Sequence, residues 1–173
     1  MKQLILGGMR SGKSALAEKL AGQSGLPVTY IATATSGDGE MAARIKAHQD
    51  QRPRDWQLIE EPLYLARTMR VHAVSDHCLL IDCLTLWVTN LLLHEDGDLF
   101  ARQKRELLET LPTLQGEIIF VSNETNMGVV PMDSLSRRFC DEMGRVHQEI
   151  AQVVERVALV VAGLPHVIKG EQI

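Results

Sequence analysis

The sequence predicts one α/β domain, spanning residues 1–173, in which helices cover both faces of a mostly parallel sheet. Short apolar runs alternate along the chain with longer amphipathic segments, which is the pattern of strand–helix–strand units. The short runs are apolar almost throughout, as expected of strands that are buried on both faces. A chain of 173 residues can bury one full core and is short for two.

The chain is predicted to begin with a strand, a helix and a second strand. Gln3–Leu6 is an apolar run that leads into a glycine-rich turn, and Lys13–Ser24 follows with the composition of a helix. Gly25-Leu26-Pro27 ends that helix, because glycine and proline both interrupt helices. Val28–Ala32 is again apolar and is predicted as the next strand.

Two helices and a short strand are predicted to follow. Gly39–Asp50 has an amphipathic pattern and is predicted as a helix. Pro53 and Pro62 bracket a short edge strand near Trp56–Ile59, and Leu63–His72 is predicted as the next helix.

The second half continues the alternation of strands and helices. Leu111-Pro112 separates a helix from the strand that follows it. The predicted strands are Cys78–Ile81, Glu117–Val121 and Ala158–Val161. The predicted helices are Leu84–His94, Leu99–Thr110 and Ser134–Arg156.

Composition and charge narrow the class of protein. Hydrophobic residues make up 45% of the chain and charged residues 23%, and the net charge is -4, so neither nucleic acid nor an anionic membrane surface is an expected partner. No apolar run approaches the ~18 residues that a membrane span needs. The first strand is also too short for a secretion signal. Three cysteines without C-x-x-C spacing suit a reducing compartment, and we expect a cytoplasmic protein.

The glycine-rich turn after the first strand has the spacing G-x-x-x-x-G-K-[ST]. It consists of Gly7, Gly8, Met9, Arg10, Ser11, Gly12, Lys13 and Ser14. Because a strand precedes it and a helix follows it, its amides are expected to surround the phosphates of a nucleoside triphosphate. Lys13 is expected to reach the β- and γ-phosphates, and the Ser14 hydroxyl to bind Mg²⁺. The alternative is a chance glycine-rich turn.

A carboxylate is expected on the Mg²⁺ side, at the end of a neighbouring strand. Asp82 ends the apolar run Leu79-Leu80-Ile81 and is the candidate. The alternative is an ordinary helix cap, because a helix is predicted from Leu84 onward. The two roles are compatible.

The predicted helix Gly39–Asp50 carries a second candidate site. Met41 and Ile45 form its inner stripe, and Arg44 and His48 lie one turn apart on a common face. Arg44 can bind a phosphate, and an imidazole beside a bound α-phosphate can act as a nucleophile. From the spacing alone, a surface histidine near the end of a helix is the more ordinary interpretation.

These motifs resemble the bifunctional adenosylcobinamide kinase / adenosylcobinamide-phosphate guanylyltransferase family, and the resemblance covers essentially the whole chain. Beyond the glycine-rich turn, the most specific match is Met41-Ala42-Ala43-Arg44-Ile45-x-x-His48, with Arg52-Pro53 and Trp56. Further matches are Tyr30–Ala34, Glu60-Glu61-Pro62, Asp82–Thr85, Val121–Glu124, Met127-Gly128, Val130-Pro131 and Val160–Pro165. Two places depart from the family pattern: Thr125-Asn126 replaces Val-Gly, and His147 replaces Asn.

The resemblance implies a P-loop fold of the RecA-like kind, a homotrimer, and two reactions at one site. The first transfers the terminal phosphoryl group of ATP or GTP to adenosylcobinamide. In the second, His48 takes GMP from GTP and releases pyrophosphate, and adenosylcobinamide phosphate then accepts the GMP. The resemblance places nucleotide contacts at Gly7–Ser14, Ala32, Thr33, Ala34, Arg44, Gln49, Asp50, Gln51, Arg52, Glu60 and Asp82. It makes His48 and Lys13 catalytic, with Mg²⁺ as cofactor held by Ser14 and Asp82.

Other interpretations stay open at this point. A small-molecule kinase without nucleotidyl transfer would need no His48, and a non-catalytic P-loop regulator would need a partner surface. A family member could also have lost the kinase step. Trp56 and Trp87 could stack on a base or a corrin ring, or pack in the core.

Overall fold

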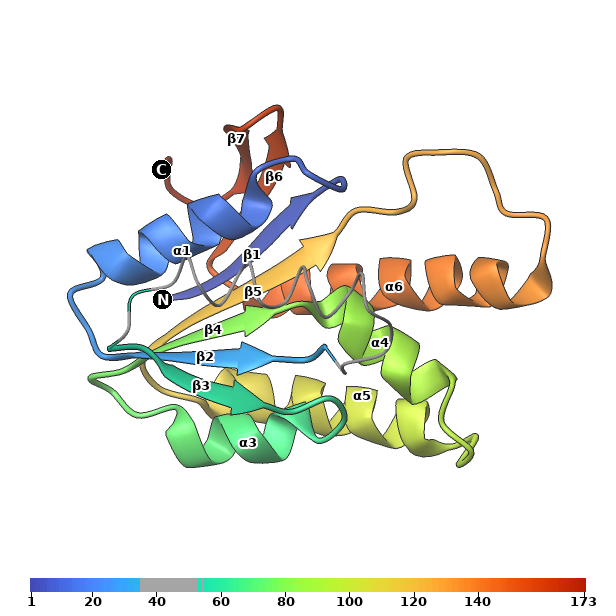
Figure 1. Cartoon of the computed structure of the whole chain (residues 1–173), viewed down its shortest axis with the longest axis horizontal. Coiled ribbons are helices and arrows are strands. Elements are labelled where there is room, and N and C mark those ends of the chain that lie inside the picture. The colour runs from blue at the N-terminus through green and yellow to red at the C-terminus, as the bar shows by residue number, and fades with distance from the viewer. Residues whose placement is uncertain (35–52, 54) are drawn as a thin grey trace.

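The computed structural model describes residues 1–34, 53 and 55–173. The predicted helix Gly39–Asp50 and the residues Arg44, His48, Gln49, Asp50, Gln51 and Arg52 lie outside the described residues. Within them, the chain forms a twisted sheet with helices packed against it (Figure 1).

The sheet has seven strands among the described residues, in the order β3-β2-β4-β5-β1-β6-β7. They are β1 (Lys2–Gly7), β2 (Val28–Ala32), β3 (Gln57–Glu60), β4 (Cys78–Asp82), β5 (Glu117–Asn123), β6 (Arg156–Val161) and β7 (Leu164–Lys169). All neighbouring pairs are parallel except β6 and β7. The prediction of a mostly parallel sheet is confirmed.

Two features of the sheet differ from the prediction. The strand of Asp82 is not next to the strand that precedes the glycine-rich turn, because β5 lies between β4 and β1. The antiparallel strand β7 was not expected. It follows a two-residue turn at Ala162 and Gly163, whose φ angles of 52° and 80° are both positive, as hairpin turns of this length require.

The helices are α1 (Lys13–Gln23), α3 (Leu65–His72), α4 (Leu84–Leu92), α5 (Leu99–Thr110) and α6 (Ser134–Val153), with a short 3-10 helix, η1 (Leu111–Thr113). α6 ends three residues earlier than predicted. The Lys169 ammonium donates hydrogen bonds to the carbonyls of Ala151, Gln152 and Val154 there, and β6 begins at Arg156.

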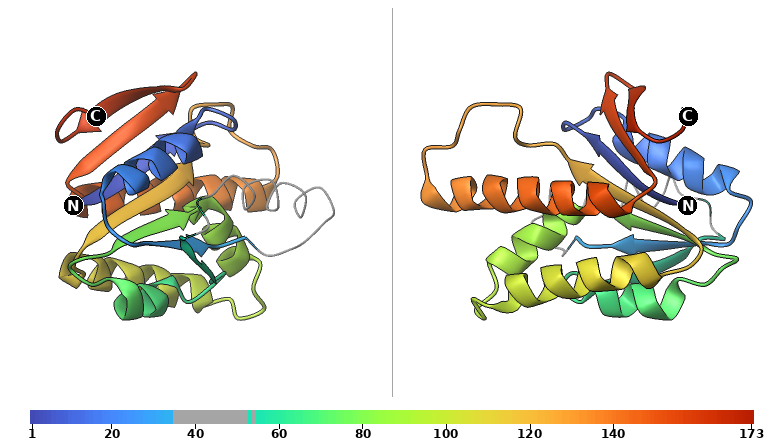
Figure 2. Two further views of the ribbon diagram at one scale, coloured as in Figure 1. Left: turned by 60° about the vertical axis from the view of Figure 1, so that its left-hand side comes forward. Right: turned by 180° about the vertical axis from the view of Figure 1, so that it is seen from behind.

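Strand residues alternate between two hydrophobic clusters, one on each face of the sheet. Leu4 and Leu6 belong to a cluster with α3, α4, α5 and α6, whereas Ile5 belongs to a cluster with Ala17 and Ala21 of α1. Figure 2 shows the same division, with α1 on one side of the sheet and α3, α4, α5 and α6 on the other. The expectation of helices on both faces is therefore confirmed.

The two tryptophans pack in these clusters. Trp87 is fully buried in the larger one, and its Nε1–H donates to the Leu63 carbonyl at 2.9 Å. Trp56 is half-buried against the smaller cluster. Core packing is thus the role that the structure gives Trp87. In the part of the chain that the structure describes, no helix is long and apolar enough to cross a membrane.

Candidate nucleotide-binding site

The glycine-rich turn forms a loop between β1 and α1. Arg10 and Gly12 adopt φ angles of 57° and 95°, and the Ser11 amide donates to the Gly8 carbonyl at 3.2 Å. The Lys13 ammonium reaches back to the same carbonyl at 3.2 Å. No side chain caps α1, so its first amides are available to an anion. The loop thus has the amides, the lysine and the helix N-terminus that phosphate binding requires.

The turn between β6 and β7 packs against this loop and donates a hydrogen bond to it. The Gly163 amide donates to the Ser11 carbonyl at 2.8 Å. A Cβ atom on Gly12 would lie 3.1 Å from the Gly163 Cα, so the two backbones touch. The sequence matched Val160–Pro165 to the family but gave no signal for this contact, because it joins residues about 150 positions apart.

Asp82 ends β4, where it is half-buried, and Thr33 holds the residue that follows it. The fully buried Thr33 hydroxyl donates to the Cys83 carbonyl at 2.7 Å and accepts from the Cys83 amide at 2.9 Å. The Thr33 amide donates to the Asp82 carbonyl, and Asn90 Nδ2 donates to the Thr33 carbonyl at 2.8 Å. All polar groups of Thr33 are therefore engaged within the protein, and its side chain positions the Asp82–Cys83 segment.

The charges of Lys13 and Asp82 act on the same buried thiol. Burial and, to a smaller extent, the Asp82 carboxylate raise the pKa of Cys83, the Lys13 ammonium opposes both, and the resulting pKa is about 11. This thiol therefore stays protonated and chemically inert at neutral pH. The parallel register pairs Gly7 with Asn123 and Asp82 with Val121, so β5 brings the glycine-rich loop and Asp82 into one neighbourhood.

The predicted contact residues that the structure describes gather at one edge of the sheet. β1, β2, β3 and β4 end at Gly7, Ala32, Glu60 and Asp82, and the parallel register pairs Ala32 with both Glu60 and Asp82. Ligands of open α/β sheets bind outside this carboxyl edge. Ala34 is half-buried and Glu60 is exposed there.

Ser14 and Asp82 are the candidate pair of Mg²⁺ ligands. Both offer the oxygen atoms that Mg²⁺ prefers, and Mg²⁺ at nucleotide sites takes one or two protein ligands besides phosphates and water. Among the described residues, no cluster of three or more His, Cys, Asp or Glu side chains is arranged to hold a metal by itself. The pair fits a metal that arrives with a nucleotide.

An apolar loop, residues 124–133, leaves this edge at the end of β5. Val129 and Met132 are each 96% exposed, and Met127 and Val130 are exposed as well. Asn126, one of the two departures from the family pattern, anchors the loop by donating to the Cys140 carbonyl at 3.0 Å. The loop is therefore held against α6 although its apolar side chains face outward.

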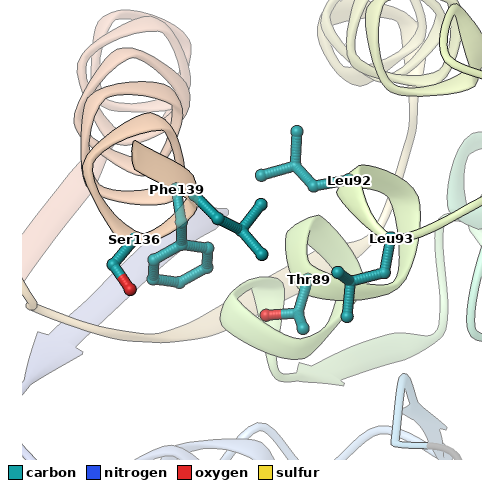
Figure 3. A pocket seen from close by; sticks show the side chains of 6 residues that line it. Thr89, Leu92, Leu93, Ser136 and Phe139 are labelled. Atoms are coloured by element: carbon teal, nitrogen blue, oxygen red, sulfur yellow. The ribbon is translucent and has the colours of Figure 1, made fainter. Parts of the chain in front are cut away.

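Two hollows lie beside α6. One, of about 220 Å³, lies between the loop and α6 and includes Val129, Pro131 and Cys140 in its lining. The other, of about 180 Å³, lies between α4 and α6, where Leu92 and Leu93 face Phe139 (Figure 3). Neither hollow is lined by a residue that the sequence predicted to contact the nucleotide.

Comparison with known proteins identifies the family of this chain. The family model described as cobinamide kinase / cobinamide phosphate guanyltransferase matches residues 3–168. The bifunctional adenosylcobalamin biosynthesis protein CobP of Pseudomonas aeruginosa is 58% identical over 171 residues, which cover 99% of both chains. The corresponding CobU proteins of Escherichia coli and Salmonella typhimurium are 36% and 37% identical, over 95% of this chain and 97% of each relative.

A solved KaiC-like protein from Pyrococcus horikoshii OT3 aligns with a TM-score of 0.49 and 15% identity, over 91% of this chain and 69% of its own. Within the described residues, the fold has the mostly parallel sheet with helices on both faces that the sequence predicted, and the glycine-rich loop follows a central parallel strand. The chain belongs to the cobinamide kinase / cobinamide phosphate guanyltransferase family of enzymes.

Proposed function

We propose that this chain phosphorylates adenosylcobinamide with ATP or GTP and then transfers GMP from GTP to adenosylcobinamide phosphate. The products of the second step are adenosylcobinamide-GDP and pyrophosphate. The observation that carries this proposal is the family match over residues 3–168 together with an intact phosphate loop at the carboxyl edge of the sheet.

In the kinase step, the loop amides and Lys13 hold the nucleotide phosphates. The acceptor hydroxyl of adenosylcobinamide attacks the γ-phosphorus, the bond to the β-phosphate oxygen breaks, and the hydroxyl loses its proton. Ser14 and Asp82 would hold Mg²⁺, which when bound neutralises charge on the phosphates. Positioning and charge neutralisation supply most of the catalysis in such a transfer.

In the second step, an imidazole nitrogen of His48 attacks the α-phosphorus of GTP and pyrophosphate leaves. A phosphate oxygen of the phosphorylated corrinoid then displaces the imidazole and takes the GMP. Arg44 binds phosphate beside His48 and disfavours the imidazolium form, which cannot attack. Gln49, Asp50, Gln51, Arg52, Glu60 and the Ala32–Ala34 segment complete the nucleotide contacts. The sequence signature around His48 supports this step.

The acceptor is a corrinoid, a wide ring system with apolar faces. The apolar loop 124–133 supports an acceptor of this kind, because it begins between the strand of the phosphate loop and the strand of Asp82. Exposed apolar patches on a protein surface commonly mark binding sites.

We further propose a homotrimer in the cytoplasm. The trimer rests on the family resemblance. All three cysteines, Cys78, Cys83 and Cys140, are free, which suits a reducing compartment.

Intact-mass analysis after incubation with GTP and Mg²⁺ tests the histidine intermediate. We expect one GMP per chain, attached to His48 through a bond that is labile in acid and stable in base. His48→Asn should remove the adduct and the guanylyltransferase activity and lower kinase activity much less, because γ-phosphoryl transfer needs no protein nucleophile. GMP on Lys46, or on no residue, would contradict the mechanism.

The matched control for this experiment is His166→Asn. His166 is exposed on β7, so its replacement should leave the adduct in place. His147 is unsuitable as a control, because it is buried and hydrogen-bonded to Ser122.

A further inference from the structure

A chain of hydrogen-bonded, buried polar side chains lies at the end of β5. None of these side chains is a predicted contact of the nucleotide. His147 of α6 is 7% exposed, and its Nε2 lies 2.8 Å from the hydroxyl oxygen of the fully buried Ser122. The Ser122 oxygen lies 3.3 Å from the Thr85 hydroxyl of α4. On the other side of the ring, His147 Nδ1 lies 3.7 Å from the Glu124 carboxylate.

The partners determine the direction of each hydrogen bond. Burial lowers the pKa of His147, with Glu124 opposing it, so the ring is neutral at neutral pH. Its proton is on Nδ1, because a nitrogen lone pair facing a carboxylate is repelled. Nε2 therefore accepts from Ser122, and Ser122 accepts from Thr85.

The hydrogen bonds of Thr85, at the other end of this series of side chains, are consistent with this direction of donation. The Thr85 oxygen accepts from the Asn123 amide at 2.8 Å, which leaves the Thr85 proton free to be donated to Ser122. The direction of donation thus runs from Thr85 of α4 through Ser122 of β5 to His147 of α6.

These hydrogen-bonded side chains are connected both to the segment of Asp82 and to the phosphate loop. Thr85 lies three residues after Asp82, at the start of α4. The Glu124 amide donates to the Gly7 carbonyl at 3.0 Å, and Glu124 also accepts from the Asn126 amide at 2.7 Å. The parallel register pairs Asn123 with Gly7 and Val121 with Asp82. The end of β5 therefore sets the spacing between the phosphate loop and Asp82.

We propose that His147 is a positioning residue for phosphoryl and nucleotidyl transfer, which holds the end of β5 in place through Ser122 and Glu124. The ring is buried and acts through these two residues rather than on the substrate. The proposal rests on the proposed function, because it assigns His147 to that reaction. It also gives a role to a residue at which this chain departs from the pattern of the family it resembles.

Two substitutions of His147 test its contact with Ser122. The amide end of a glutamine occupies roughly the place of Nε2 and can accept from Ser122. His147→Ala removes both contacts. We expect kcat for both transfers to fall by about 10-fold or more in His147→Ala and to stay within about 3-fold of wild type in His147→Gln.

The nucleotide KM and the amount of GTP analogue bound per chain should change little in His147→Ala. If His147 were only structural, turnover would fall in proportion to the fraction of chains that bind nucleotide. Ile150→Val is the control, since Ile150 is buried on the same helix and has no polar group. Equal turnover per bound nucleotide in His147→Ala and wild type would overturn the proposal, as would equal losses in His147→Gln and His147→Ala.

Hydrogen exchange of the Asn123 and Glu124 amides provides a readout that needs no turnover. We expect faster exchange at both amides in His147→Ala and near-normal exchange in His147→Gln and Ile150→Val. Unchanged exchange in His147→Ala would overturn the positioning role. If the wild-type enzyme fails to turn over adenosylcobinamide with GTP, the proposed function is wrong, and hydrogen exchange still decides whether His147 holds the end of β5.

Discussion

Thr33→Val tests whether the buried hydroxyl of Thr33 holds the segment that carries Asp82. Valine has nearly the same shape as threonine, so the change removes the hydroxyl and leaves the packing almost unaltered. The Cys83 amide and carbonyl, at 2.9 and 2.7 Å from that hydroxyl, would both lose their partner. Leaving a buried polar group unsatisfied costs about 1–3 kcal/mol. We therefore expect the free energy of unfolding to fall by about 2–4 kcal/mol.

Urea denaturation at 25 °C measures this loss, and thermal unfolding should show a decrease in Tm of about 5–15 °C for a domain of this size. Thr33→Ser is the control. It keeps the hydroxyl and removes one methyl group, which costs about 1 kcal/mol. Mg²⁺-dependent GTP binding should weaken in Thr33→Val and stay near normal in Thr33→Ser. If the valine variant is no less stable than the serine variant, Thr33 does not anchor Cys83 in the way described.

Three further predictions concern the phosphate loop and the assembly. Lys13→Ala should lower both activities by at least about 100-fold, because the phosphate charge loses its partner; near-normal turnover in either assay would reject the loop assignment. Gly163→Ala should cost about 1–2 kcal/mol, because its φ of 80° disfavours an L side chain, and should weaken GTP binding through Ser11. Ala162→Gly, at a φ of 52°, should instead preserve both stability and binding, as thermal melts and titrations can show. Light scattering at micromolar concentration should give the mass of a trimer, and a monomer mass would contradict the proposed assembly.

Local patterns in the sequence were sufficient for most of the fold. Strands buried on both faces are apolar throughout, so β1, β2, β4 and β5 were placed within two residues of their observed bounds. The glycine-rich loop was recognisable because its glycines, lysine and serine are consecutive in the chain. The family resemblance added His48, which composition and spacing alone left as an ordinary surface histidine and which lies outside the described residues.

Contacts between distant segments could not be predicted in this way. β7 is largely exposed, so it lacks the apolar signature of the other strands, and it exists because its backbone pairs with β6. The position of β5 between β1 and β4 is likewise a matter of strand order, which no local pattern encodes.

The same distinction between local patterns and distant contacts applies to the candidate site. The sequence by itself was enough to predict which residues bind phosphate and Mg²⁺, since that chemistry belongs to Lys13, Ser14 and Asp82 individually. Only the tertiary structure decided what holds them: the Gly163 amide behind the phosphate loop and the Thr33 hydroxyl on Cys83. These hydrogen bonds join segments far apart in the chain, and they arise only when the sheet has brought the segments together.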